Sequence, residues 1–157
     1  MANNLFPEGY ENEVIEAADL EDSKTIGYRN GVSFDEQTGD FRRDGKNRML
    51  DSTGIESWQS WCINCLQTER YKHLAYSTDF GIERDAVFAA TSREEAESIL
   101  TRQITEAIMA DPYGRTEYIE EIEFDWTAPD AIRIHLVIHG IEDVSIDILA
   151  YITKEAT

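Results

Sequence analysis

The last third of the sequence alternates between apolar and polar residues, and this pattern constrains the fold more than any other feature. Apolar side chains occupy every second position over residues 132–138 and 144–150. A shorter stretch of the same kind precedes them at Ile122, Phe124 and Trp126. A period of two is typical of a strand with one buried face, because successive side chains point to opposite sides. The sequence therefore predicts an antiparallel meander of three strands with one buried face.

Two other segments show helical periodicity, and each opens with a Ser or Thr followed three residues later by Glu, as in a capping box. Thr53 with Glu56 begins the first, whose apolar positions are Ile55, Trp58, Trp61, Cys62, Cys65 and Leu66. Ser92 with Glu95 begins the second, whose apolar stripe is Ala96, Ile99, Leu100, Ile104, Ala107 and Ile108. These patterns predict amphipathic helices over residues 54–68 and from Ser92 to a stop at Asp111, since proline disfavours helical backbone at the residue before it.

Short extended segments complete the expected fold. Residues 32–34 and 41–43 flank a loop whose Gly and Asp content is typical of a hairpin, and a further turn follows at residues 44–45. Residues 71–80 mix aromatic and β-tolerant side chains, which predicts a strand or extended crossing between the helices. The expected fold class is α+β: an antiparallel C-terminal meander with two packed amphipathic helices, preceded by a short β-hairpin and an extended N-terminal arm.

The charge of the chain is strongly acidic and unevenly spread. Lys and Arg number 14 against 32 Asp and Glu, giving a formal charge of -18. Residues 1–23 contain seven of these acids and no Lys or Arg. We expect residues 1–23 to be an acidic extended arm that orders on a partner, and a frayed tail is an equally good alternative. Residues 24–157 have the size of one domain.

Charge and composition also exclude several classes of protein. So acidic a chain repels a phosphate backbone and an anionic membrane surface, which argues against direct nucleic-acid or membrane binding. Two cysteines are too few for a disulfide scaffold, the start of the sequence carries no apolar leader, and no apolar run approaches the ~20 residues of a membrane span. We therefore expect a soluble protein made in the cytoplasm.

Cysteine and histidine pairs give little evidence of chemistry. Cys62 and Cys65 lie within the first predicted helix beside two tryptophans, and no second pair completes a four-ligand zinc site. A redox pair would place its first cysteine at a helix N-terminus, so we expect two buried small hydrophobes. His135 and His139 are four apart, but on a strand this spacing separates them by about 13 Å, and we expect them to face solvent.

Acidic pairs are frequent without forming a recognisable catalytic site. Glu121, Glu123 and Asp125 are expected on the polar face of one strand, whereas a glycosidase needs one carboxyl in an apolar pocket that keeps it protonated. The sequence also lacks the common phosphate-binding, nucleophile-elbow and zinc-protease motifs. We predict no catalytic residue, no metal ligand and no cofactor, and hence a protein that is not an enzyme.

The order of segments resembles a known family. MLDSTG at residues 49–54 leads into WQSW at 58–61 and then TERYKHLAYSTDFG at 68–81, followed by the long helix, Asp111-Pro112 and the meander. Over residues 32–151 this is similar to the PBSX-prophage-type baseplate family, which is related to baseplate wedge proteins that serve as sheath initiators in contractile phage tails.

The resemblance implies assembly in place of catalysis. Members of this family sit in six copies around the tail tube and offer strand edges to the first sheath ring, so the implied partners are the sheath protein, the tube and baseplate wedge or hub proteins. The implied locations are the host cytoplasm during assembly and then the baseplate of the virion or phage-tail-like particle.

The resemblance also points to particular residues. Wedge relatives carry Glu-Pro-Arg where the second helix ends, and the matching place here reads DPYGR at residues 111–115, with altered spacing. The implied assembly interface consists of Asp111, Pro112, Arg115, Val144, Ile146 and Ile148.

Three functions are considered for a chain with this sequence. The first is a structural adaptor that joins baseplate and sheath by strand addition. The second is an acidic binding protein that mimics DNA, which requires carboxylates in two rows on a convex surface. The third and weakest is an acid-dependent hydrolase. The sequence leaves open the ring size, the strand edge used and the kind of particle.

Overall fold

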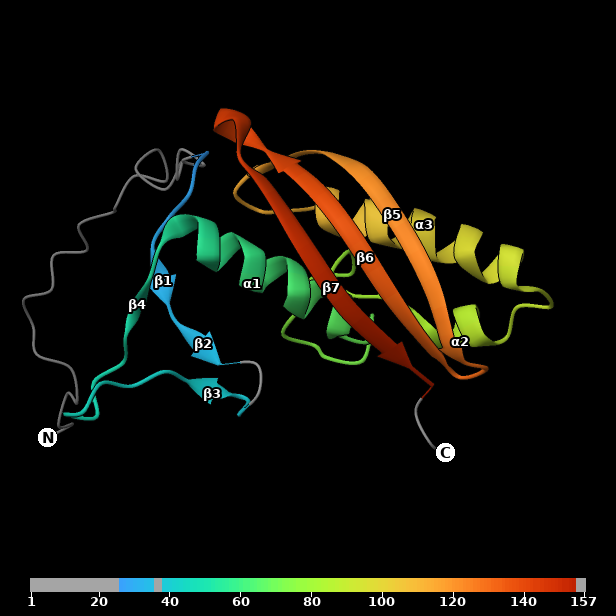
Figure 1. The fold of residues 1–157 in the computed structure, drawn as a ribbon, viewed down its shortest axis with the longest axis horizontal. Helices are drawn as coiled ribbons and strands as arrows, with labels where there is room; N and C mark the ends of the chain where they lie inside the picture. Colours follow the sequence, from blue (N-terminus) through green and yellow to red (C-terminus); the bar gives the residue numbers. More distant parts are fainter. Residues whose placement is uncertain (1–25, 36–37, 155–157) are drawn as a thin grey trace, which may run out of the picture.

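A computed structural model describes residues 26–35 and 38–154, so the arm expected at residues 1–23 lies outside the described residues. The described chain has the predicted α+β fold (Figure 1). Its elements, in chain order, are β1 Gly31–Val32, β2 Phe34–Asp35, β3 Asp40–Phe41, β4 Asp51–Ser52, α1 Gly54–Gln67, α2 Arg84–Phe88, α3 Arg93–Met109, β5 Thr116–Ala128, β6 Ala131–Gly140 and β7 Ser145–Thr153.

The C-terminal strands form the predicted antiparallel meander, in the order β5-β6-β7. Even-numbered side chains of β6, from Ile132 to Ile138, are fully buried. Their counterparts on β7, from Ile146 to Ile152, are also buried, while odd-numbered residues of that strand are exposed. The alternation of apolar and polar residues in the sequence therefore corresponds to a sheet with one covered face.

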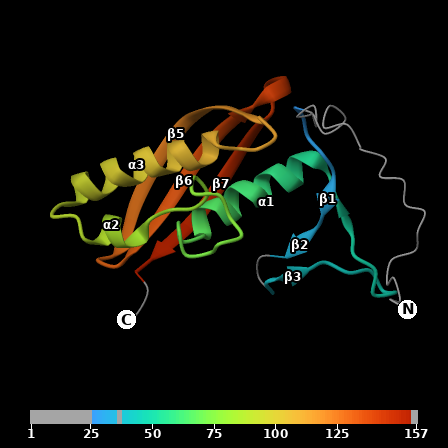
Figure 2. The same ribbon diagram turned by 180° about the vertical axis from the view of Figure 1, so that it is seen from behind.

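Helices α1 and α3 cover that face, as Figure 2 shows from behind. Helix α1 packs mainly on β7 and α3 mainly on β5. Their buried side chains include Trp58, Cys62, Cys65 and Leu66 from α1 and Leu100, Ile104 and Ile108 from α3. Because burial of one large apolar side chain stabilises a protein by about 1.5–3 kcal/mol, this helix-on-sheet core is the main source of stability.

The start of α1 confirms the predicted capping box. The Glu56 amide donates to Thr53 Oγ1 at 3.3 Å, and the Thr53 amide donates to Glu56 Oε2 at 2.8 Å. The bond from the Thr53 amide lowers the pKa of Glu56, because it stabilises the carboxylate form. The helix ends at Gln67, one residue before the predicted end.

The prediction for α3 needs two corrections, one to its capping box and one to its C-terminal end. Its Ser92 side chain accepts from the Glu95 amide at 3.1 Å, but the Glu95 carboxylate bonds to the amide and hydroxyl of Thr91, so only half of the capping box forms. The helix ends at Met109, two residues before Asp111. The Asp111 carboxylate accepts a hydrogen bond from the backbone amide of Arg115, which lies beyond the helix. This contact favours an end of the helix before Asp111.

The N-terminal hairpin is confirmed and lies to one side of the sheet and helices (Figure 1). Strand β2 pairs with β3 with Phe34 opposite Phe41, and β1 pairs with β4. Asp44 closes the second turn by accepting hydrogen bonds from the amides of Lys46 and Arg48 at 2.8 and 2.9 Å.

The predicted strand or extended crossing at residues 71–80 is wrong, because this segment consists of turns and bends. Its two ends meet in a parallel bridge between Glu69 and Ile82. The buried Arg70 side chain donates to the carbonyls of Gly81 at 2.9 Å and Gln103 at 3.3 Å. Arg70 thus joins the end of this loop to helix α3, and within the loop Tyr76 packs on His73 and Phe80. The short α2 that follows was not predicted.

Gly81 is required at the base of this loop. Its φ is +98°, and a Cβ at this position would lie 2.7 Å from the carbonyl oxygen of Thr68. Any other residue would therefore strain or displace the closure.

Candidate functional site

Strand β7 has an outer edge to which no other strand of the described chain pairs. The Gly140 amide donates to the Val144 carbonyl at 2.8 Å, and the Lys154 amide donates to the Asp130 carbonyl at 2.9 Å. Both bonds join even-numbered residues, and hydrogen-bonded pairs alternate along an antiparallel ladder. The peptide groups that face away from β6 are therefore those of Ser145, Asp147, Leu149, Tyr151 and Thr153.

One of these outward groups has a partner. Gln59 Nε2 of α1 lies 3.5 Å from the Asp147 carbonyl oxygen, a long hydrogen bond. The β6–β7 register contains no shift over nine residue pairs, so the edge is regular along its length.

The opposite edge of the sheet, on β5, is irregular. Its pairing with β6 shifts register at three places, each of which inserts one extra residue: Glu117, Glu120 and Thr127. Bulges and exposed charges are common features that protect a strand edge from pairing with another chain. Strand β7 is therefore the better edge for addition of a strand.

The predicted interface residues of this strand lie mainly in the core. Ile146 and Ile148 are 6% and 1% exposed, and Val144 packs against the same core. A role of this strand in assembly would act through its backbone and its odd-numbered side chains, and the contact role of the three predicted residues stays a prediction.

Asp111 and Arg115 form a buried ion pair. Arg115 Nε and Nη2 donate to the two carboxylate oxygens at 2.9 and 2.8 Å, and the Arg115 amide donates to the same carboxylate at 2.8 Å. The two side chains are 1% and 4% exposed, respectively. The pair fixes the α3–β5 connection, while Pro112 and Tyr113 between them are exposed. Whether this segment contacts a partner stays a prediction.

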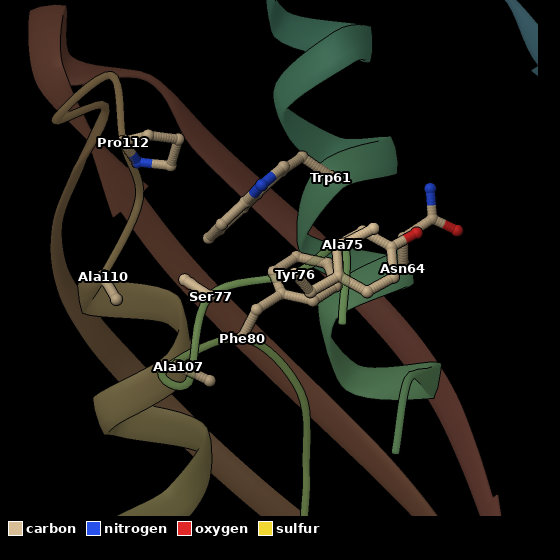
Figure 3. A pocket seen from close by; sticks show the side chains of 9 residues that line it. All are labelled: Trp61, Asn64, Ala75, Tyr76, Ser77, Phe80, Ala107, Ala110 and Pro112. Atoms are coloured by element: carbon tan, nitrogen blue, oxygen red, sulfur yellow. The ribbon is translucent and has the colours of Figure 1, made fainter. Parts of the chain in front are cut away.

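Pro112 borders an apolar cavity of about 390 Å³. Figure 3 shows Trp61 of α1, Phe80 and Tyr76 of the 71–80 loop, and Pro112 around a common space. The Arg115 guanidinium lies over the Trp61 ring, 5.7 Å from its centroid. The DPYGR segment, α1 and residues 71–80, which we call the aromatic loop, therefore form one surface. Sequence reasoning missed this surface because the three segments are distant along the chain.

The aromatic loop also presents apolar side chains to solvent. Leu74 is fully exposed, and Tyr71 and Tyr76 are more than half exposed. Arg70 and Gly81 fix both ends of the loop, and of these three side chains Tyr76 lines the cavity. Exposed apolar groups of this kind next to a cavity mark an interaction surface.

The cysteines are placed as predicted. Cys62 and Cys65 are both completely buried in the core. Burial raises the pKa of the Cys62 thiol, and it raises the pKa of Cys65 to about 11, so both thiols stay protonated.

The histidines lie on a strand, as predicted, and both bind carboxylates on the uncovered face of the sheet. His135 of β6 has Nε2 2.7 Å from Asp147 Oδ1 on β7 and Nδ1 3.4 Å from Glu123 Oε2 on β5. The bond to Asp147 raises the pKa of His135, since it stabilises the protonated ring. His139 pairs with Glu120.

The acids of β5 also lie where they were predicted, on the polar face of one strand. Glu121, Glu123 and Asp125 are exposed, and they lie opposite Val137, His135 and Arg133. Among residues 26–35 and 38–154, no three His, Cys, Asp or Glu side chains are grouped to hold a metal ion. The helices of the described chain include none that is both long and apolar enough to cross a bilayer.

Comparison with known proteins gives one family. Residues 31–143 match the family model described as contractile injection system sheath initiator. No curated protein matches the chain. The matched range extends from β1 to the turn before β7 and includes the DPYGR segment and the aromatic loop.

Proposed function

The chain belongs to the sheath initiator family of contractile injection systems, and from this premise we propose that it joins the baseplate and tail tube to the first sheath ring by strand addition at β7. The coarse function, a structural baseplate component of such a system, follows from the family. The partners in this proposal are the sheath protein on one side and tube and baseplate wedge or hub proteins on the other.

One observation carries the proposal: a regular nine-residue strand whose outward peptide groups are unpaired by any described strand. Backbone hydrogen bonds join an added strand to such an edge, and its alternate side chains select the partner. The exposed Leu149 and Tyr151 are the apolar side chains available for this selection. The match to a sheath initiator model favours this function over the DNA-mimic and hydrolase alternatives.

The second contact in the proposal is the surface formed by the cavity, the aromatic loop and Pro112. It lies on the helical layer, whereas the β7 edge belongs to the sheet, so one partner at each place can bind without excluding the other. We assign the tube or baseplate proteins to this surface and the sheath subunit to β7.

Replacing one outward amide tests the strand addition. Leu149→Pro removes an amide that faces away from β6, so the ladder to β6 keeps its bonds while the outer edge loses a donor. Leu149→Ala removes the side chain and keeps the amide. We expect baseplates with Leu149→Pro to nucleate sheath at least ~10-fold more slowly than baseplates with Leu149→Ala, measured by electron microscopy of sheath polymerising on purified baseplates.

Thermal unfolding of both variants controls for the fold. If the proline variant is folded and nucleates sheath as well as the alanine variant, addition at β7 is wrong. If both variants fail equally, the Leu149 side chain, and not the strand edge, makes the contact.

A further inference from the structure

Aromatic rings and arginines alternate in a row that begins at the wall of the apolar cavity. Trp61 lines the cavity, and the Arg115 guanidinium lies over its ring. The same guanidinium lies 5.0 Å from the centroid of the Tyr113 ring, and the Arg29 guanidinium lies 5.2 Å from that centroid. The row of Trp61, Arg115, Tyr113 and Arg29 therefore connects the cavity to the segment before β1.

The two arginines of this row differ in what balances their charge. Arg115 is buried, and its guanidinium is bound to the Asp111 carboxylate. Arg29 is exposed, and no Asp or Glu within residues 26–35 and 38–154 forms an ion pair with it. A guanidinium that stacks on a ring keeps the N–H groups at its edge available for a carboxylate. Arg29 is thus a positioned cation to which no described anion is bound.

The residue next to Arg29 fixes its place on the domain. The Tyr28 hydroxyl donates to the Ile141 carbonyl at 2.9 Å, and the Tyr28 ring packs on Trp58 with 5.5 Å between the ring centroids. The backbone that carries Arg29 is therefore attached both to α1 and to the turn before β7. A side chain that is already held in place loses less conformational entropy when a partner binds.

The cavity at the other end of the row has the size and lining of a binding site. Its volume is about 390 Å³ and most of its lining is apolar, as is usual for pockets that hold a ligand. Trp61 meets Phe80 edge to face with 5.7 Å between centroids, and Tyr76 stacks on Phe80 at 4.6 Å (Figure 3). Because these rings pack on one another, they form an aromatic wall against which a large apolar side chain can pack.

On the proposed function, tube or baseplate proteins bind this surface, and we propose that they do so through a segment with two groups: a large apolar side chain that enters the cavity and a carboxylate that binds Arg29. Burial of the apolar group supplies affinity, while the ion pair selects this segment among other apolar ones. The chain has a formal charge of -18, so it repels acidic proteins at long range. Salt screens charges beyond about 8 Å, so the cation beside a bound carboxylate outweighs the distant acids of the chain.

Reversing the charge at Arg29 tests the ion pair. Arg93→Glu is the matched control for Arg29→Glu, because the Arg93 guanidinium also lies over an aromatic ring, 5.4 Å from the Trp126 centroid, at the start of α3. Co-sedimentation of the full chain with purified baseplates lacking this protein measures joining at about 150 mM salt. We expect Arg29→Glu to raise the apparent Kd for the baseplate at least ~10-fold and Arg93→Glu to leave it unchanged. Higher salt should narrow the difference between Arg29→Glu and the wild type, because it screens the ion pair.

Filling the cavity tests the apolar contact. Ala110 lines the cavity at the C-cap of α3, so Ala110→Phe occupies the space that the partner needs, and Ala110→Leu is a smaller change of the same kind. Ala89→Phe is the matched control, because Ala89 is an exposed C-cap alanine on α2 and does not line this cavity. We expect Ala110→Phe to weaken joining at least ~10-fold, Ala110→Leu to weaken it less, and Ala89→Phe to join as the wild type does. Circular dichroism checks that every variant is folded.

The outcomes separate this contact from strand addition. Sheath nucleation counted per occupied baseplate should stay as in the wild type for every variant, because β7 is unchanged. Folded Arg29→Glu and Ala110 variants that join normally would overturn the proposal and leave strand addition intact, and loss of joining in only one of the two positions would show that the segment does not carry both groups. A wild type that does not join baseplates would refute the proposed function as well. Sedimentation of the chain alone tests a second copy as the occupant, and self-association that these same substitutions abolish would overturn the choice of a tube or baseplate partner.

Discussion

At the scale of single residues, the Asp111–Arg115 pair combines almost complete burial with three hydrogen bonds to one carboxylate. It is the buried ion pair that joins the end of α3 to the start of β5. A bidentate arginine–carboxylate contact combines charge with fixed geometry. The same two residues were implied as interface residues by the family resemblance. Their burial means that they can shape this surface by positioning Pro112 and Tyr113, which are exposed.

Asp111→Asn tests this role. The substitution keeps the size of the side chain but leaves the Arg115 guanidinium buried without its counter-charge, so we expect the free energy of unfolding to fall by about 3 kcal/mol. Urea denaturation measures the change. Asp125→Asn, which breaks the exposed pair with Arg133, is the matched control and should cost less than about 1 kcal/mol. Equal effects of the two substitutions would contradict the structural role.

At the scale of elements, α1 connects the candidate surfaces. Its buried residues pack on β7, its Trp61 lines the apolar cavity and its Gln59 reaches the β7 edge. The capping box at Thr53 fixes where this helix begins, immediately after β4. The position of the hairpin relative to the core therefore depends on a local signal that is readable in the sequence.

Thr53→Ala should lower the stability of the domain by about 1 kcal/mol, because it leaves the Glu56 amide without its side-chain acceptor. Chemical denaturation followed by tryptophan fluorescence measures the loss. Thr101→Ala is the comparison, because Thr101 is an exposed threonine within α3 whose hydroxyl donates back to the Glu97 carbonyl. We expect this second substitution to be neutral or slightly stabilising. A Thr53→Ala protein as stable as wild type would show that the cap contributes nothing to this helix.

At the scale of the whole molecule, the described chain is a sheet covered on one face by helices, with a regular edge at β7, a bulged edge at β5 and a hairpin to one side. The division into an arm of residues 1–23 and a domain of residues 24–157 stays a prediction. It implies that the domain holds all of the core. The arm would then contribute to assembly and not to folding.

Deletion of residues 1–23 should therefore leave the Tm of the domain within about 2 °C of the full chain, because an arm that orders only on a partner contributes nothing to the free energy of folding. Calorimetry measures the Tm, and co-sedimentation with purified baseplates lacking this protein measures joining, which we expect to weaken. A truncated protein that unfolds would contradict the division into arm and domain, and one that joins as well as the full chain would remove the arm from assembly.

The elements with a strong local signal were predictable from the sequence. The alternation around Ile134 and Ile148 defined the sheet and its buried face, and the stripe from Ala96 to Ile108 defined α3. The wrong prediction concerns a segment in which local composition and tertiary contacts favour different structures. Residues 71–80 have the composition of a strand, but Arg70 and aromatic packing hold them in turns.

The candidate surfaces were predictable only in part. Pro112 was singled out by the family resemblance, but its neighbours Trp61, Tyr76 and Phe80 come from two distant segments and carry no common pattern. The sequence predicted a free strand edge and left open which one, because the bulges of β5 that distinguish the two edges have no signature in the alternation. Ile146 and Ile148 were singled out on the correct strand, although their side chains lie in the core.

The sequence by itself determined the α+β class, the covered face of the sheet, the start of α1 and the acidic character of the molecule, because periodicity, caps and charge are local properties of the chain. Only the tertiary structure decided which peptide groups of β7 face outward, which residues share a cavity and which charges are already paired. Each of these depends on a register or on a contact between distant segments, and the same local pattern is compatible with several of them.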